Sequence, residues 1–147
     1  MSDGVDIRPA MPSDFNAVES WLVSAGLPSA DITPEHLNDF LVATLDDALI
    51  GVIGLEQTDS VGLLRSLVVD PSVRGGGIGK QLVERLESMA KERGISKLWL
   101  LTIDADGYFM KLRYDRRERI EAPIDIQNTA EFSGLCPGDA VLMCKML

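Results

Sequence analysis

Cysteine is scarce in this chain of 147 residues. Only Cys136 and Cys144 are present, and neither belongs to a Cys-x-x-Cys pair. Disulfide frameworks and cysteine zinc sites need more cysteines at closer, regular spacing. We therefore expect buried thiols and no metal site.

Long apolar runs are also absent. No window approaches the roughly 18 uninterrupted apolar residues that a membrane-spanning helix requires. The N-terminal stretch MSDGVDIRPA lacks the basic start and apolar core of a secretory signal. We expect no membrane association and, by default, a cytoplasmic location.

Basic residues are nearly missing from the first sixty positions, where Arg8 stands alone. That stretch holds eleven acidic residues and a net charge of −10, whereas the remainder carries +1 within a total of −9. Nucleic-acid binding depends on Lys and Arg neutralising phosphates, so we expect none here. An acidic surface mainly serves solubility. The alternative is that the second half binds an anionic ligand and the first half meets a cationic or zwitterionic one.

The length suits one domain with a real core, so we expect a single domain spanning 1–147. Helical spacing of apolar residues predicts helices at 11–26, 33–40, 77–94 and 104–113, with a further helical piece around 125–132. Apolar and β-branched runs predict strands at 5–10, 40–46, 49–57, 61–70, 96–103 and 140–147. One further strand, without assigned bounds, is expected before the last. The order is β-α-α-β-β-β-α-β-α-β-β, an α/β (α+β) arrangement with tight turns at 46–48 and 58–60.

Three consecutive glycines join a strand to a helix in the stretch VVDPSVRGGGIGKQLVERL, residues 68–86. A helix N-terminus offers unpaired N–H groups and a positive dipole end, so glycines leading into it can wrap closely around a phosphate. The dinucleotide pattern GxGxxG fails because Lys80 stands where its third glycine belongs, and GxxxxGK[ST] fails at Arg74 and Gln81. What remains is R-x-x-G-x-G, formed by Arg74, Gly77 and Gly79.

This stretch resembles the acetyl-CoA signature of the GCN5-related N-acetyltransferase (GNAT) superfamily, [RQ]-x-x-G-x-[GA] between a strand and a helix. The order of elements agrees over essentially the whole chain. The resemblance implies the GNAT fold, a central mixed and mostly antiparallel sheet of about seven strands flanked by helices. It also implies acetyl-CoA as cofactor, with its pyrophosphate and pantetheine arm held by Leu67, Val68, Val69, Arg74, Gly75, Gly76, Gly77, Ile78, Gly79 and Lys80.

Many members of the superfamily protonate the leaving thiolate with a tyrosine in a segment like FYEKLGF. The matching segment here is YFMKLRY, in which Phe109 replaces the tyrosine and Arg113 the glycine. Either Tyr108 or Tyr114 reaches the sulfur, or the thiolate leaves without a dedicated acid. We favour the second, because an ordinary thiol pKa of about 8.5 makes it feasible.

Glu56 is the leading candidate for the proton acceptor because GLE lies on the strand beside the one expected to bind the cofactor. Its alternative is a solvent-facing carboxylate. Arg65 and Ser66 lie mid-strand, where a charge is expensive to bury unless it is paired. They meet an acidic group of the substrate, or Arg65 pairs with Glu56 as a structural bridge. His36 is a further candidate for substrate contact, with an inert surface histidine as its alternative.

The sequence is also similar to the arsenic-resistance branch of the superfamily, on the residues GLLRSLVVDPSVRGGGIG and the tail APIDIQNTAEFSGLCPGDAVLMCKML. That resemblance implies acetylation of a free amine on a small amino-acid-like compound, such as an arsenical or phosphinic glutamate analogue. Two alternatives are an acyl-CoA-binding regulatory module without turnover and an acetyltransferase of polyamines or protein N-termini. A C-terminal strand with a free edge would allow a homodimer.

Overall fold

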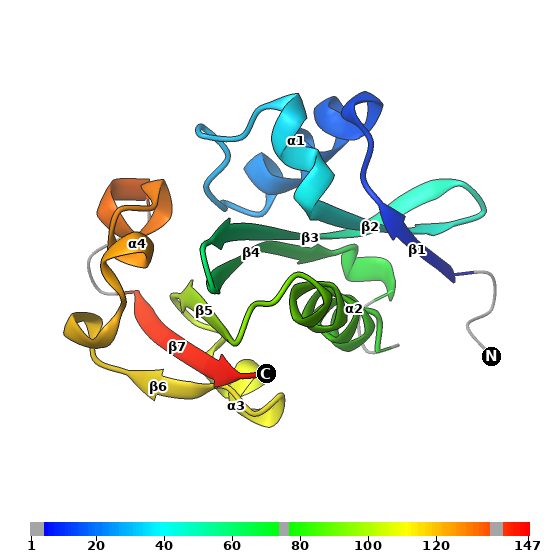
Figure 1. The fold of residues 1–147 in the computed structure, drawn as a ribbon. Coiled ribbons are helices and arrows are strands. Elements are labelled where there is room, and N and C mark those ends of the chain that lie inside the picture. The colour runs from blue at the N-terminus through cyan, green and yellow to red at the C-terminus, as the bar shows by residue number, and fades with distance from the viewer. Residues whose placement is uncertain (1–4, 74–76, 136–139) are drawn as a thin grey trace. The chain divides into compact units, whose positions relative to one another are not determined.

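The computed structural model describes residues 5–73, 77–135 and 140–147. Over these residues the strands form one seven-stranded sheet in the order β1-β2-β3-β4-β5-β7-β6 (Figure 1). The antiparallel pairs are β1–β2, β2–β3, β5–β7 and β6–β7. Strands β4 and β5 pair in parallel. The predicted mixed, mostly antiparallel sheet is therefore confirmed. The strands are β1 Val5–Pro9, β2 Phe40–Leu45, β3 Ala48–Thr58, β4 Val61–Val69, β5 Lys97–Thr102, β6 Asp115–Arg117 and β7 Val141–Met146.

Helices and helical turns connect these strands in the predicted order. The α-helices are α1 Phe15–Ser24, α2 Ile78–Glu92, α3 Asp106–Lys111 and α4 Ile124–Gln127. The 3-10 turns are η1 Pro12–Asp14, η2 Pro34–Asp39, η3 Pro71–Val73 and η4 Arg119–Glu121, and η5 Glu131–Leu135 is a π-helical turn. None of the described helices is long and apolar enough to cross a bilayer.

The chain divides into two compact units. Unit 1 consists of Met1–Leu55 and Ser66–Leu86, and unit 2 of Glu56–Arg65 and Glu87–Leu147. The boundary falls inside β3, β4 and α2, so each unit takes part of these elements.

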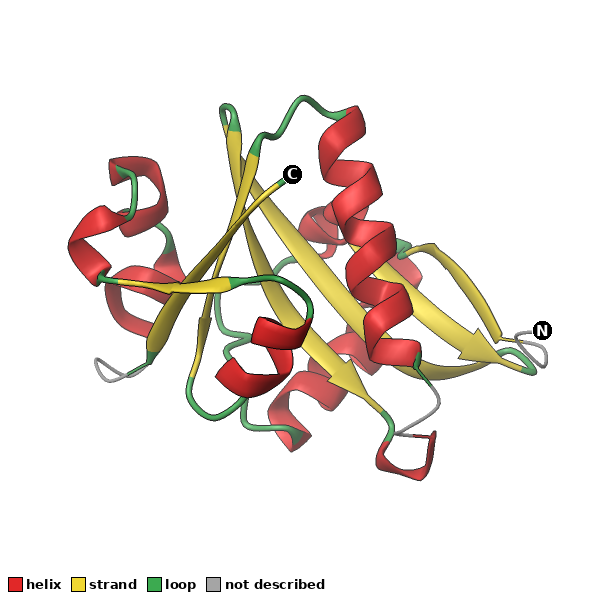
Figure 2. Cartoon of the chain, turned by 90° about the horizontal axis from the view of Figure 1, so that it is seen from below, coloured by secondary structure: helices red, strands yellow, loops and turns green. Residues whose placement is uncertain are grey.

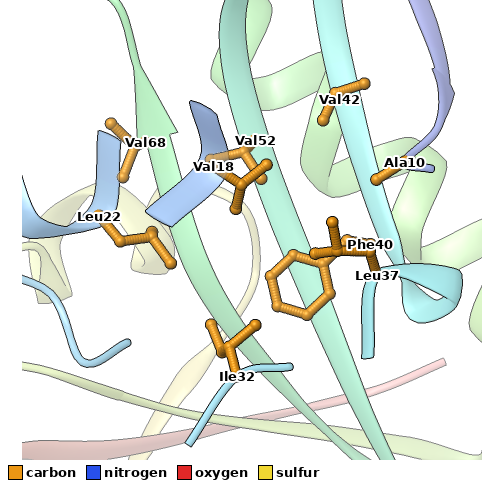
Figure 3. Close-up of a cluster of buried hydrophobic side chains, with 9 residues drawn as sticks. All are labelled: Ala10, Val18, Leu22, Ile32, Leu37, Phe40, Val42, Val52 and Val68. Atoms are coloured by element: carbon orange, nitrogen blue, oxygen red, sulfur yellow. The ribbon is translucent and has the colours of Figure 1, made fainter. Parts of the chain in front are cut away.

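The core of unit 1 forms where α1 meets the inner residues of strands β2, β3 and β4 (Figure 3). Val18 and Leu22, one helical turn apart on α1, are fully buried, as the apolar spacing predicted. The helix ends at Ser24, and Gly26 beyond it has a φ of +71°, a left-handed conformation that glycine adopts without strain. The buried members of this core are Ala10, Val18, Leu22, Ile32, Leu37, Phe40, Val42, Val52 and Val68.

A cross-strand pair fixes the middle of unit 1. Phe40 on β2 lies directly opposite Gly54 on β3. A Cβ built on Gly54 would lie only 2.4 Å from the Phe40 ring. The ring therefore packs on bare glycine backbone, which leaves no room for any side chain at position 54.

Helix α2 is one continuous helix from Ile78 to Glu92 (Figure 2). Ile78, Leu82, Val83 and Leu86 are buried, as predicted for its apolar face, and Met89 is partly buried. The helix ends in a Schellman motif, in which Gly94 N–H donates to Lys91 O at 3.0 Å and Ile95 N–H donates to Ala90 O at 3.0 Å. Gly94 takes the left-handed conformation that this motif requires, with φ +82°.

The core of unit 2 lies between strands β4, β5 and β7 and the helical tail. Its buried members are Leu63, Trp99, Ala122, Ile126, Leu142 and Cys144. The expected burial of the thiol is thus confirmed for Cys144, whereas Cys136 lies outside the described residues.

The prediction that the C-terminal strand has a free edge is wrong. Strand β7 pairs with β5 on one side and with β6 on the other, where Asp115–Arg117 face Leu142–Cys144. The edge strand on the β7 side of the sheet is β6, whose residues Asp115, Arg116 and Arg117 are all exposed. Charged side chains on an edge strand oppose pairing with another chain, so the structure gives no strand-pairing route to a dimer at β7.

Smaller expectations also hold, with one change of helix type. The turns at 46–48 and 58–60 form with positive φ at Asp46, Asp47 and Asp59. The short helix beginning at Thr33 and Pro34 exists, but as the 3-10 turn η2.

Candidate functional site

The end of β4 in unit 1 is held rigidly up to the glycine loop. Leu67 and Val69 are half-buried and Val68 is buried, in the alternation of a strand. The Asp70 N–H donates to Ile50 O at 2.8 Å, and Asp70 Oδ1 accepts hydrogen bonds from Ser72 N and Ser72 Oγ, each at 2.9 Å. These bonds fix the path of the chain as it leaves the strand.

The start of α2 has the geometry of an anion site. Gly77 has φ +81°, and its carbonyl accepts the Gln81 N–H at 3.0 Å, so Gly77 caps the helix. The next three residues, Ile78, Gly79 and Lys80, form the first turn, where N–H groups lack intrahelical acceptors. Nothing lies within 4 Å of a Cβ built on Gly77, which leaves space beside the backbone for a ligand.

Backbone N–H groups, the positive end of a 15-residue helix and open space together suit a phosphate. Arg74, Gly75 and Gly76, the other residues expected in this loop, lie outside the described residues.

Ser66 and His36, two predicted substrate contacts, also belong to unit 1. Ser66 is buried and has φ +63°, a conformation that costs a non-glycine residue about 1–3 kcal/mol and that clusters at functional sites. His36 is exposed, and its Nδ1 accepts the Thr33 N–H at 3.1 Å across the first turn of η2. That bond gives the ring a local structural role.

The remaining candidates lie in unit 2, where β4 and β5 pair over three positions, Val61–Leu63 with Lys97–Trp99. The next residues of β4, Leu64 and Arg65, are not paired with the next residues of β5. Parallel strands that part in this way present backbone groups to which an extended, peptide-like ligand can bind.

Three charged side chains form an ion cluster in unit 2, which we call the Arg65 cluster. Arg65 Nη1 lies 3.0 Å from Glu56 Oε1, and Arg65 Nε lies 3.2 Å from Glu131 Oε2. The side chains of Arg65 and Glu131 are 3% and 5% exposed, whereas that of Glu56 is 34% exposed. Arg65 was predicted either to meet an acidic group of the substrate or to form an ion pair with Glu56. The ion pair with Glu56 is present in the structure.

Glu131 was not among the predicted site residues. It stands between Ala130 and Phe132 in the tail. The sequence indicates only that an arginine in the middle of a strand needs carboxylate partners if it is buried. It does not indicate which of the 23 acidic residues lies beside Arg65.

The predicted aromatic segment forms α3 and the turn after it. Tyr108 is 41% exposed, and burial of the rest of its side chain raises the pKa of the hydroxyl. Phe109 is buried, with its ring centroid 5.3 Å from that of Tyr108 and 5.7 Å from that of Tyr114, both edge to face.

Tyr114 is tied into a buried network that the sequence did not reveal. Its hydroxyl donates to Glu87 Oε2 at 2.9 Å, and Lys145 Nζ donates to both Glu87 oxygens at 3.1 and 3.0 Å and to Leu112 O at 3.1 Å. Burial, together with the Glu87 carboxylate, raises the pKa of Tyr114 above its ordinary value. A hydroxyl held in this way is a poor proton donor to a ligand.

No group of three or more His, Cys, Asp or Glu side chains suited to a metal ion occurs among the described residues.

Residues 7–111 match the acetyltransferase (GNAT) family. The chain belongs to this family. An N-acetyltransferase of Chlorobaculum tepidum, itself uncharacterised, is 34% identical over 86 residues, which are 58% of this chain and 55% of that protein. The amino-acid acetyltransferase of Pseudomonas putida is 33% identical over 101 residues, 67% of this chain and 22% of that enzyme. The chain therefore spans about half of one relative and less than a quarter of the other.

The fold of this GNAT protein also matches solved structures. N-acetylglutamate synthase from Neisseria gonorrhoeae, complexed with coenzyme A and N-acetyl-glutamate, superposes with a TM-score of 0.84 at 22% identity, covering 97% of this chain and 35% of that one. The predicted GNAT fold is thus confirmed.

The segment YFMKLRY, residues 108–114, ends α3 in a defined turn. Arg113 has φ +76°, and its N–H donates to Met110 O at 3.0 Å while Tyr114 N–H donates to Phe109 O at 3.0 Å. This is the Schellman motif seen at Gly94, with an arginine in the left-handed position. The resemblance predicts a glycine at position 113. The left-handed φ of Arg113 explains that expectation, because glycine adopts this conformation without strain.

Proposed function

We propose that this chain is an acetyl-CoA-dependent N-acetyltransferase that acetylates the free amine of a small amino-acid-like substrate by direct transfer. The observation that carries the proposal is the N-terminus of α2, where Gly77 caps the helix at the family's signature position with open space beside it. Acetyl-CoA supplies the acetyl group as a thioester.

The cofactor contacts that we propose are mainly backbone groups of unit 1. The N–H groups of Gly75 to Lys80 bind the pyrophosphate, and Arg74 adds a fixed positive charge. Leu67, Val68 and Val69 offer strand backbone to the pantetheine arm, which resembles a peptide.

For the chemistry, we propose that Glu56 accepts the proton of the substrate ammonium, directly or through water. It is the most exposed member of the Arg65 cluster, and Arg65 holds its carboxylate from one side. In this scheme Arg65 orients Glu56, and Ser66 and His36 remain the proposed substrate contacts. We assign no side chain to protonate the departing thiolate, because Phe109 has no acidic proton and Glu87 engages Tyr114.

The proposed substrate class rests on the relatives. One is an amino-acid acetyltransferase, and the Neisseria gonorrhoeae structure holds N-acetyl-glutamate. The tail from Ala122 adds the narrower proposal of an arsenical or phosphinic glutamate analogue, which rests on the resemblance to the arsenic-resistance branch.

An acceptor screen tests this function. The protein is incubated with acetyl-CoA and a panel of amino acids, glutamate analogues, spermine and peptides, while release of free thiol is followed. We expect amino-acid-like acceptors to give the highest kcat/KM, and Glu56→Gln to lower kcat by at least about 100-fold, the usual contribution of a general base. Spermine or peptides outperforming every amino acid would replace this substrate class with the polyamine or N-terminal alternative.

The second candidate is an acyl-CoA-binding module without turnover. It is favoured by Phe109 at the usual tyrosine position and by the engagement of Tyr114 with Glu87. Tight binding of acetyl-CoA in calorimetry, with no acceptor-dependent thiol release from any amine in the panel, would favour this module over the enzyme.

A further inference from the structure

We propose that Glu131 is a positioning residue for the reaction, which acts through Arg65 on the carboxylate of Glu56. The inference rests on the proposed function of Glu56 as the proton acceptor. It joins the tail segment to the chemistry through contacts that lie wholly within unit 2.

The first step is the geometry of the guanidinium. Glu131 contacts Nε and Glu56 contacts Nη1, so the two carboxylates use different nitrogen atoms of one rigid, planar group. Holding Nε therefore fixes the direction in which Nη1 points. The position of Glu56 Oε1 then depends on Glu131, although the two acids are 75 residues apart in the sequence.

The second step is charge. A buried arginine facing one carboxylate would hold that carboxylate strongly in its ionised form and weaken it as a base. Glu131 is as buried as Arg65 and shares the positive charge of the guanidinium. Neutralising Glu131 would therefore remove one of the two carboxylates that these contacts bring to the guanidinium.

The third step is that the turn carrying Glu131 is itself anchored. The Arg119 guanidinium lies 4.7 Å above the Phe132 ring and donates from Nη1 to Ala140 O at 3.0 Å. The buried Thr129 hydroxyl donates to Ile126 O at 2.7 Å, and Ser133 N–H donates to Thr129 O at 2.9 Å. Single π-helical turns such as η5 occur frequently at functional sites.

The test compares Glu131→Gln with Asp125→Asn in the full chain. Both remove one negative charge, but Asp125 is an exposed residue of α4 outside the cluster. Glutamine keeps an oxygen that can accept from Arg65, so the variant should fold, which a thermal melt checks. The Glu56 carboxyl is followed by carbon-13 NMR during a pH titration, with Glu56→Gln providing the assignment.

In Glu131→Gln we expect the carbon-13 titration curve of Glu56 to move to lower pH, because the guanidinium has then lost one of its two carboxylate contacts. We also expect kcat to fall about threefold at the alkaline plateau with little change in KM, because a weaker base takes the proton less readily. Glu131→Asp, which restores the charge, should recover part of both effects, and Asp125→Asn should show neither.

An unmoved Glu56 titration overturns the proposal, and so does an unchanged kcat in an active enzyme. If no amine is acetylated by the wild-type protein, the proposed function fails. The titration needs no turnover, so in that case it still decides whether Glu131 acts on Glu56.

Discussion

Arg113 carries a conformation that its side chain opposes. A left-handed non-glycine residue costs about 1–3 kcal/mol, and Arg113 has φ +76° at the end of α3. The same motif at the end of α2 uses Gly94, so one chain contains both the relaxed and the strained form. The strain persists because the two hydrogen bonds of the motif and the contact of Phe109 with Tyr114 require that turn.

Arg113→Gly should therefore stabilise the protein. We expect the free energy of unfolding to rise by about 1 kcal/mol, the relief of strain less the entropy that glycine loses on folding. Urea denaturation measures this. Arg117→Gly, at an exposed strand position where φ is not positive, should do the opposite. A loss of stability in Arg113→Gly would contradict the strain argument.

A substitution of Tyr108 tests the proposal that no side chain protonates the departing thiolate. Tyr108→Phe removes only the hydroxyl of a side chain that is 41% exposed, so stability should change little. If the thiolate leaves unassisted, kcat should stay within about twofold of wild type, whereas a general acid contributes about 100-fold or more. A loss of that size in steady-state kinetics would restore Tyr108 as the acid.

The elements with a strong period were predictable, and those formed by tertiary contact were not. The apolar spacing of Val18 and Leu22 and of Ile78 to Leu86 placed α1 and α2, because one buried face decides a helix. Strand β6 reads Asp115-Arg116-Arg117 and has no apolar pattern, so only pairing with β7 makes it a strand. One strand was expected before the last, but no pattern placed it at 115–117, so its pairing with the edge of β7 was not predicted.

Some residues of the candidate site were likewise predictable from the sequence, and others were not. The loop at Gly77 was predictable because its chemistry is local: glycines, a helix start and a preceding strand. The bridge from Arg65 to Glu56 was one of the two predicted roles of Arg65. Its second partner Glu131 and the partner of Tyr114, Glu87, were not predicted, since both acids are distant in sequence and any of the chain's acids satisfied the local pattern. Long-range pairing of buried charges needs the fold before it can be assigned.

At the scale of the element, the N-terminus of α2 can be tested by two nearly isosteric variants. Gly77→Asp and Gly77→Asn accept the positive φ of +81° at similar cost, but only aspartate adds a negative charge. We expect Gly77→Asp to bind acetyl-CoA at least about 100-fold more weakly than Gly77→Asn, because the carboxylate would oppose the pyrophosphate. Titration calorimetry measures both affinities. Equal affinities would remove the pyrophosphate from this loop.

The stability of the whole molecule should fall in alkali because of Tyr114. Its pKa is raised by burial and by Glu87, so the folded state keeps a proton that the unfolded chain releases above pH 10. The stabilisation is complete below that pH and is lost as pH rises further toward the folded-state pKa, at about 1.4 kcal/mol per pH unit. Burial raises the pKa of Cys144 and adds to this trend.

Tyr114→Phe isolates that contribution. At pH 7 the variant should be about 1 kcal/mol less stable than wild type, the usual net value of one hydrogen bond. Above pH 10 the difference should shrink with each further step, because phenylalanine has no proton to lose. Urea unfolding at several pH values tests this, and parallel curves for the two proteins would contradict it.

The contact between Phe40 and Gly54 restricts which substitutions this chain can accept. Because the ring occupies the space of a Cβ at position 54, any mutation there alone makes the new side chain clash with a buried aromatic. A smaller residue at position 40 would relieve the clash, but made first it would leave a void in the core of unit 1. Each single step is thus harmful, and the two positions should change together or not at all over the protein's evolution.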